Sequence, residues 1–307
     1  MDRILSTTGR ERSFDSSCVS QSTFGDRAVT QFTKEEVLAD SFKAEFVKAF
    51  LQECAVPLRP AGKAMYQRTI CFLEHAKRYE QLEVLKQALK DAKVDLDARG
   101  NCETTMLHSA VWKGYIPLVE FLLDAGADLE AKNSSGWTPL LQTVRFGHYA
   151  SCIKMTRYLL AAGAEVDAID NTGATALHFI ARWNSLEALE AFLKAGARTD
   201  LIDDYGYTVF HYAARWGHLE VAERFMQEGG VLLSPKIINA VDKAGRTALY
   251  LAASNGSLSV VKVLVEAGAD YQIANNEGNT PIQAAEKYGY QEVVEFLNKT
   301  LYQKTLL

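Results

Sequence analysis

The segment Tyr-Thr-Val-Phe-His-Tyr-Ala-Ala-Arg-Trp-Gly-His, residues 207–218, recurs in altered form along most of the chain. Its threonine has five counterparts, at Thr105, Thr138, Thr175, Thr247 and Thr280. With Thr208 included, the successive intervals are 33, 37, 33, 39 and 33 residues. A nearly fixed period of this length indicates a solenoid, in which similar supersecondary units stack on one another.

The residue types of each copy predict two short helices joined by turns. A threonine caps the first helix because its side chain accepts from free N–H groups. Glycine ends each helix, since a left-handed residue reverses the chain cheaply, and Asn184 replaces it in the third copy. Neighbouring first helices are predicted to pack closely where each copy has a small alanine, at Ala110, Ala181, Ala213, Ala252 and Ala284.

These copies resemble the ankyrin repeat, whose signature is Thr-Pro-Leu-His. The signature appears as Thr138-Pro139-Leu140 and as Thr175-Ala176-Leu177-His178. The later part of the repeat is matched by Leu264-Val265-Glu266-Ala267-Gly268-Ala269-Asp270. The resemblance covers about residues 70–300 and implies an all-α ankyrin-repeat solenoid with short hairpin loops. It also implies that the signature histidines are framework residues, bonded to neighbouring backbone.

The chain divides into three predicted parts. Residues 1–33 are rich in Ser and Thr with few apolar residues, which predicts a disordered tail. Residues 34–65 form a predicted N-terminal helical cap that opens with a capping box. Its helix either packs on the first repeat or binds a partner. Residues 66–307 form the repeat domain, with a degenerate first repeat followed by about six copies. Insertions fall within 148–156 and 230–239 and mark loops or binding surfaces.

Composition and motifs exclude several kinds of function. The net charge of −5 argues against nucleic-acid binding, and no apolar stretch is long enough for membrane insertion. Five cysteines without a Cys-x-x-Cys motif suit free thiols and a cytoplasmic location, with the nucleus or a host cytosol as alternatives. No cofactor loop or metal-ligand spacing occurs. Cys71 and His75 could form a nucleophile–base pair on one helix, but no third group supports catalysis.

The candidate partner-binding residues are those outside the repeat framework. In the ankyrin family, hairpin tips and first-helix ends contact partners on the concave side. Aromatic and basic residues occupy such positions here, and these residue types are enriched at binding hot spots. They are Trp112, Lys113, Trp137, Arg145, Phe146, Arg182, Trp183, Tyr205, Tyr207, Arg215, Trp216, Lys287 and Tyr288. The alternative is that their rings pack between neighbouring copies.

The resemblance predicts a non-catalytic protein–protein interaction module, an adaptor or scaffold. It is expected to be a monomer that binds a protein segment with acidic and bulky apolar residues through the concave groove. Two other functions stay open. One is a bacterial effector that uses a host-like ankyrin array, and the other is an adaptor or enzyme whose active part is residues 1–60.

Overall fold

The computed structural model describes residues 95–145, 150–228 and 235–305. It forms two compact units, Met1–Ser109 with Pro117–Asp128 and Ala110–Ile116 with Leu129–Leu307. The predicted tail, the predicted cap and the pair Cys71 and His75 lie outside the described residues.

The described part of the first unit holds a 3-10 turn, η3 (Asn101–Glu103), and most of α6 (Ile116–Asp124). The helix α5 (Met106–Trp112) begins in this unit and ends in the second. Within η3, Cys102 has a left-handed backbone (φ 54°) and forms a disulfide bond. The expectation of free thiols is therefore wrong for Cys102.

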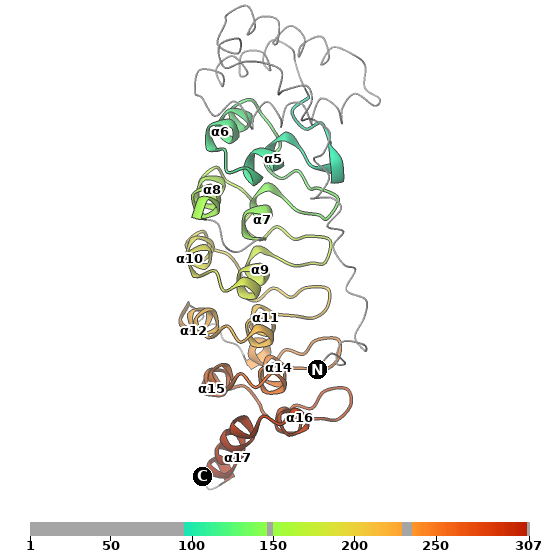
Figure 1. Cartoon of the computed structure of the whole chain (residues 1–307), viewed down its shortest axis with the longest axis vertical. Coiled ribbons are helices and arrows are strands. Elements are labelled where there is room, and N and C mark those ends of the chain that lie inside the picture. Colours follow the sequence, from blue (N-terminus) through green and yellow to red (C-terminus); the bar gives the residue numbers. More distant parts are fainter. Residues whose placement is uncertain (1–94, 146–149, 229–234, 306–307) are drawn as a thin grey trace, which may run out of the picture. The chain divides into compact units, whose positions relative to one another are not determined.

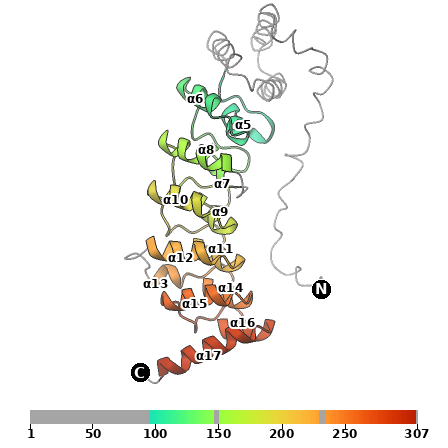
Figure 2. The same ribbon diagram turned by 60° about the vertical axis from the view of Figure 1, so that its left-hand side comes forward.

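The second unit is a stack of helix pairs, as the repeat predicted (Figure 1). One row holds the first helix of each copy, and consecutive members contact one another. They are α7 (Pro139–Val144), α9 (Ala176–Trp183), α11 (Val209–Trp216), α14 (Ala248–Ser254) and α16 (Pro281–Tyr288). The second row holds α8 (Ala150–Ala161), α10 (Leu186–Lys194), α12 (Leu219–Glu228), α15 (Leu258–Glu266) and α17 (Gln291–Thr305). Figure 2 shows the two rows from another side. The all-α solenoid is confirmed, with no strand in the part of the chain that is described.

The capping, turn and packing residues predicted from the sequence have those roles in the structure. The hydroxyls of Thr138, Thr208 and Thr247 accept the backbone N–H three residues later. Gly217 and Asn184 end their helices with φ of 71° and 55°, so asparagine does take the left-handed place of glycine. The five predicted packing alanines are all buried, which lets the first helices lie close together.

Hairpin loops connect the copies and bond to one another at their tips. In the fourth copy, the N–H of Asp203 donates to the carbonyl of Tyr207 across the hairpin, at 3.0 Å. The N–H of Asp204 donates to the previous tip, at Thr172 O, and the carbonyl of Tyr205 accepts from the next tip, at Lys243 N. Their N···O distances are 2.9 and 3.0 Å. Each tip is thus fixed to both neighbours, and the loops project to one side of the stack (Figure 1).

The copies with insertions depart from the pattern in two ways. In the second copy, α8 has 12 residues where α10 has 9, so part of the insertion lengthens the outer helix. In the fourth copy, the four-residue helix α13 (Pro235–Ile238) lies within the inserted segment. The terminal helix α17 exposes Glu292, Glu295 and Lys299, a polar outer face that suits the end of the stack.

Candidate functional site

In the second unit, the residue directly before each signature threonine stands at the exit of a hairpin, beside the end of the first helix of its own copy. These residues are Trp137, Ala174, Tyr207, Arg246 and Asn279. Their side chains differ in size and charge, whereas the framework around them repeats. They decide what the basic residue at the helix end can contact, so the three pairs of an arginine and the aromatic residue after it, Arg145–Phe146, Arg182–Trp183 and Arg215–Trp216, are not equivalent.

In the second copy the pair is part of the packed structure. Trp137 is only 5% exposed, and its indole N–H donates to Asp170 Oδ2 at 3.2 Å. The guanidinium carbon of Arg145 lies 4.0 Å from the Trp137 ring centroid, and burial lowers the pKa of Arg145 to about 10. Trp137 therefore packs against the neighbouring copy, which is the alternative stated for these rings. Phe146, the next residue of that pair, lies outside the described residues.

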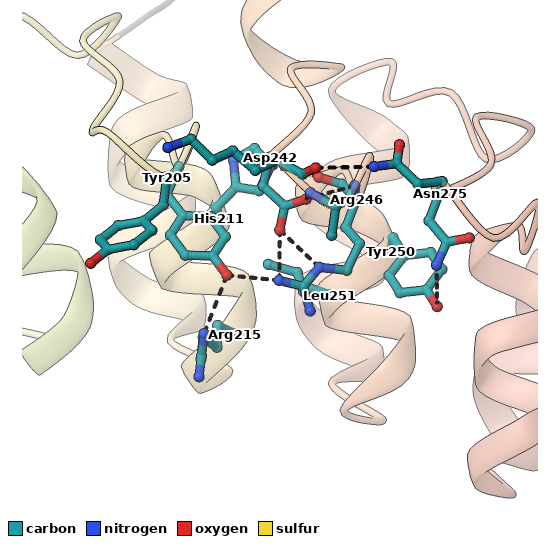
Figure 3. Close-up of polar contacts among 12 residues, drawn as sticks. Tyr205, His211, Arg215, Asp242, Arg246, Tyr250, Leu251 and Asn275 are labelled. Atoms are coloured by element: carbon teal, nitrogen blue, oxygen red, sulfur yellow. Dashed lines mark hydrogen bonds and ion pairs between the residues drawn. The ribbon is translucent and has the colours of Figure 1, made fainter. Parts of the chain in front are cut away.

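In the fourth copy the arginine is held by a tyrosine. Arg215 Nη1 donates to the hydroxyl of Tyr207 at 3.3 Å, and Arg246 Nη2 donates to the same oxygen at 2.8 Å (Figure 3). Arg246 is in turn paired with the buried Asp242, 2.7 Å away. The hydroxyl of Tyr207 is thus held between the end of α11 and the next hairpin, and its position fixes Arg215.

In the third copy the arginine has no such neighbour, because alanine stands at position 174. The guanidinium carbon of Arg182 lies 5.1 Å from the ring centroid of Trp183 and 5.6 Å from that of Trp216. Its Nε is buried without a hydrogen-bond partner in the described structure. Trp183 and Trp216 are 37% and 49% exposed. A cation held between two partly exposed indoles has unused donors for an anionic group.

Two sets of contacts, which meet at the adjacent residues Arg215 and Trp216, define a surface that we call the cation–aromatic patch. It consists of Arg182, Trp183, Tyr205, Tyr207, Arg215 and Trp216. Arg182 links the two tryptophans, and Tyr207 links the helix end to the hairpin. Tyr205 is 53% exposed, and its ring centroid lies 6.5 Å from that of Tyr207.

Buried carboxylates support the patch without neutralising its surface. Asp203 is buried and accepts from the N–H groups of Tyr205 and Tyr207 and from the hydroxyl of Tyr212, at 2.8–2.9 Å. Burial raises the pKa of Asp203, an effect that these donors oppose. Burial also raises the pKa of Tyr212, and the Asp203 carboxylate adds to the effect. These groups hold the hairpin rigid beneath the exposed rings.

The remaining predicted residues lie apart from the patch. Trp112 and Lys113 are exposed at the end of α5. Lys287 and Tyr288 are exposed at the end of α16, with the ammonium 5.8 Å from the ring centroid. The fifth copy carries Ser254 at the equivalent place and interrupts the row. The candidate partner-binding residues therefore do not form a continuous row. One cluster of them lies in the third and fourth copies.

Sequence reasoning missed two sets of residues around the patch. The first is the residue before each signature threonine, above all Ala174, whose small side chain offers Arg182 no hydrogen-bond partner from the hairpin. The second is a row of exposed apolar residues directly before the loop aspartates, namely Ile169, Ile202 and Val241. Aligning the copies on the threonine would have revealed both columns as variable positions in a constant framework.

The histidines have framework roles. His178 and His211 point Nε2 at the carbonyls of Tyr207 and Arg246, at 3.1 and 3.0 Å, and burial lowers the pKa of each ring to about 4. The His218 ring bonds to the carbonyl of Arg182 at 3.0 Å. Within the described ranges, no cluster of His, Cys, Asp or Glu could hold a metal ion. No helix described is both long and apolar enough to cross a membrane.

Comparison with known proteins identifies the repeats. A model described as ankyrin repeats in three copies matches residues 148–234 and 230–305, and a second ankyrin-repeat model matches residues 89–140. Neither describes an enzyme family.

Curated relatives come from bacteria and vertebrates. An ankyrin repeat protein of Rickettsia bellii is 38% identical over 22% of this chain and 46% of its own length. Notch-regulated ankyrin repeat-containing protein A of Danio rerio is 38% identical over 20% of this chain and 54% of its own. Ankyrin repeat domain-containing protein 63 of Homo sapiens is 42% identical over 20% of this chain and 16% of its own length. The match thus spans about half, or less, of these relatives. The chain belongs to the ankyrin-repeat family, whose repeats are protein–protein interaction modules.

Proposed function

We propose that the cation–aromatic patch binds a partner segment that carries carboxylates beside bulky apolar side chains. The observation that carries this proposal is Arg182, a cation close to the partly exposed rings of Trp183 and Trp216 that makes no ion pair within the described residues. A carboxylate from a partner would pair with the two terminal nitrogens of its guanidinium, in the bidentate geometry that such groups favour.

The apolar half of the recognition comes from the exposed rings. Trp183, Trp216 and Tyr205 present large, rigid surfaces, and burying them under a partner removes apolar area from water. A monomer gains nothing from leaving such rings exposed together, so the cluster favours a binding site over packing. The chain acts in this proposal as a non-catalytic adaptor that selects its partner by this surface.

The patch is built before the partner arrives. Tyr207 is fixed by two arginines, and Asp203 is fixed by three donors. The tips of neighbouring hairpins are bonded to each other. A preformed surface loses little conformational entropy on binding, so more of the contact energy is expressed as affinity.

The test is selection of peptides from a random display library against the full chain, followed by titration of the recovered peptides. Trp183→Ala and Trp216→Ala should each cost about 2 kcal/mol, or about 30-fold in Kd, as central hot-spot residues do. Arg182→Glu should weaken binding at least as much, and binding of wild type should weaken with added salt.

The matched control is Arg157→Glu, which makes the same charge change at an exposed residue of α8, in the other row of helices. It should leave affinity nearly unchanged. Recovered peptides that bind all three patch variants as tightly as wild type would place recognition elsewhere on the chain and overturn the proposal.

A further inference from the structure

The spacing of the hairpins constrains the conformation of the partner that the proposed function requires. Each hairpin is two antiparallel segments wide, joined in the fourth copy by the bond from Asp203 N to Tyr207 O. Neighbouring tips are joined directly by a further backbone bond, from Asp204 N to Thr172 O. One copy therefore advances by two strand spacings, or roughly 9.5 Å, along the stack.

A ligand that lies along the stack must repeat its side chains at this interval on the same face. A β-strand fails, because three residues advance about 10 Å but residues i and i+3 point to opposite faces. An α-helix returns to the same face after seven residues and about 10.5 Å, which exceeds the single interval within the patch by about 1 Å. A polyproline II helix returns after three residues and about 9.3 Å, close to the interval.

The two sides of the patch also suit this conformation. The helix ends supply Arg182–Trp183 and Arg215–Trp216, one interval apart, and the hairpin of the fourth copy alone supplies Tyr205 and Tyr207. A polyproline II helix has three ridges, of which one can contact the helix ends and a second the hairpin while the third faces water. Aromatic rings that line a groove are the usual surface for proline-rich segments, because the ligand is already ordered before it binds.

We propose that the partner segment is an acidic, proline-rich sequence bound as a polyproline II helix along the cation–aromatic patch. Prolines or other bulky apolar residues recur at every third position and cover Trp183, Trp216 and Tyr205. Carboxylates on the adjacent ridge reach Arg182, whose guanidinium makes no ion pair within the part of the chain that is described. This inference rests on the proposed function and adds the conformation and composition of the ligand.

Three synthetic peptides of about 12 residues test it, matched in net charge and in the number of aspartates. The first carries proline at every third position, for polyproline II. The second carries a heptad pattern, for an α-helix, and the third alternates apolar and acidic residues, for a β-strand. Each is labelled at one end, and fluorescence anisotropy measures its binding to the full chain and to the Arg182→Glu and Arg157→Glu variants.

The proline peptide should bind at least tenfold more tightly than the other two, and Arg182→Glu alone should remove that preference. If the heptad or alternating peptide binds as tightly as the proline peptide and depends on Arg182, the conformation is wrong while the proposed function stands. A fourth peptide, with the residues of the proline peptide in scrambled order, serves as a control. If the proline peptide binds no better than this control, or binds equally to the Arg182→Glu variant, the inference is overturned.

Discussion

The stability of the repeat stack should fall as the pH is lowered from 7 to 5, because His178 and His211 are buried as neutral rings. In each, Nδ1 accepts the N–H of the capping threonine at 3.1 Å, and Nε2 points at a carbonyl. A second proton on the ring would have to bind Nδ1, which already accepts this backbone N–H, so the charged form would lose that hydrogen bond. Burial accordingly lowers the pKa of both rings to about 4.

The sign and size of the effect follow from linkage. The folded pKa lies below the unfolded value of about 6.5, so the unfolded chain binds more protons in this range. Stability is complete above pH 6.5 and is lost as the pH falls toward 4. Between pH 7 and pH 5 each histidine should cost about 2 kcal/mol of unfolding free energy, or roughly 4 kcal/mol for the pair.

Urea unfolding monitored by circular dichroism at the two pH values measures this loss. The chain supplies its own control, since Gln283 takes the histidine place in the last copy and its side chain accepts from Thr280 N at 2.8 Å. A His178→Gln/His211→Gln variant should keep the caps and lose most of the pH dependence. The same pH dependence in wild type and in this variant would refute the neutral buried histidines.

Other predictions concern packing and turns, and urea midpoints check them all. Trp137→Ala should destabilise the fold by about 3–5 kcal/mol because the ring is buried, whereas Trp216→Ala should change stability by less than about 0.5 kcal/mol. Gly245→Ala should cost at least about 1 kcal/mol more than Gly278→Ala, since both have positive φ but only the first Cβ meets the next loop, 2.7 Å from its backbone nitrogen. Equal losses of unfolding free energy in these two variants would mean that neighbouring loops move apart at little cost. Gly217→Val should cost about 1–3 kcal/mol, and an unchanged midpoint would contradict its left-handed turn.

The fold was predictable because its signals are local and repeated. Threonine caps, glycine and asparagine turns and packing alanines each act within one copy or between adjacent copies. Six copies in the same order make any single deviation unimportant. The lengthened α8 was also visible as extra residues between two glycines.

The candidate site was predictable only as a set of positions. Whether a helix-end arginine has a partner within the chain depends on the side chain that approaches it from the hairpin. That is a tertiary contact, which the sequence does not show directly. Trp137 and Arg145 have the residue types of a binding pair, yet the indole bonds to Asp170 of the next copy and is buried. Ala174 has no functional group of its own, but its small side chain leaves Arg182 without a hydrogen-bond partner from the hairpin.

An NMR spectrum tests directly the proposed contact of Trp183 and Trp216 with a partner. The four indole N–H signals of the full chain are assigned by single substitutions, and a peptide recovered by selection is then added. The signals of Trp183 and Trp216 should shift on binding, while that of Trp137, bonded to Asp170, should stay in place. Shifts that omit both Trp183 and Trp216 while the peptide is bound would contradict the cation–aromatic patch as the recognition surface.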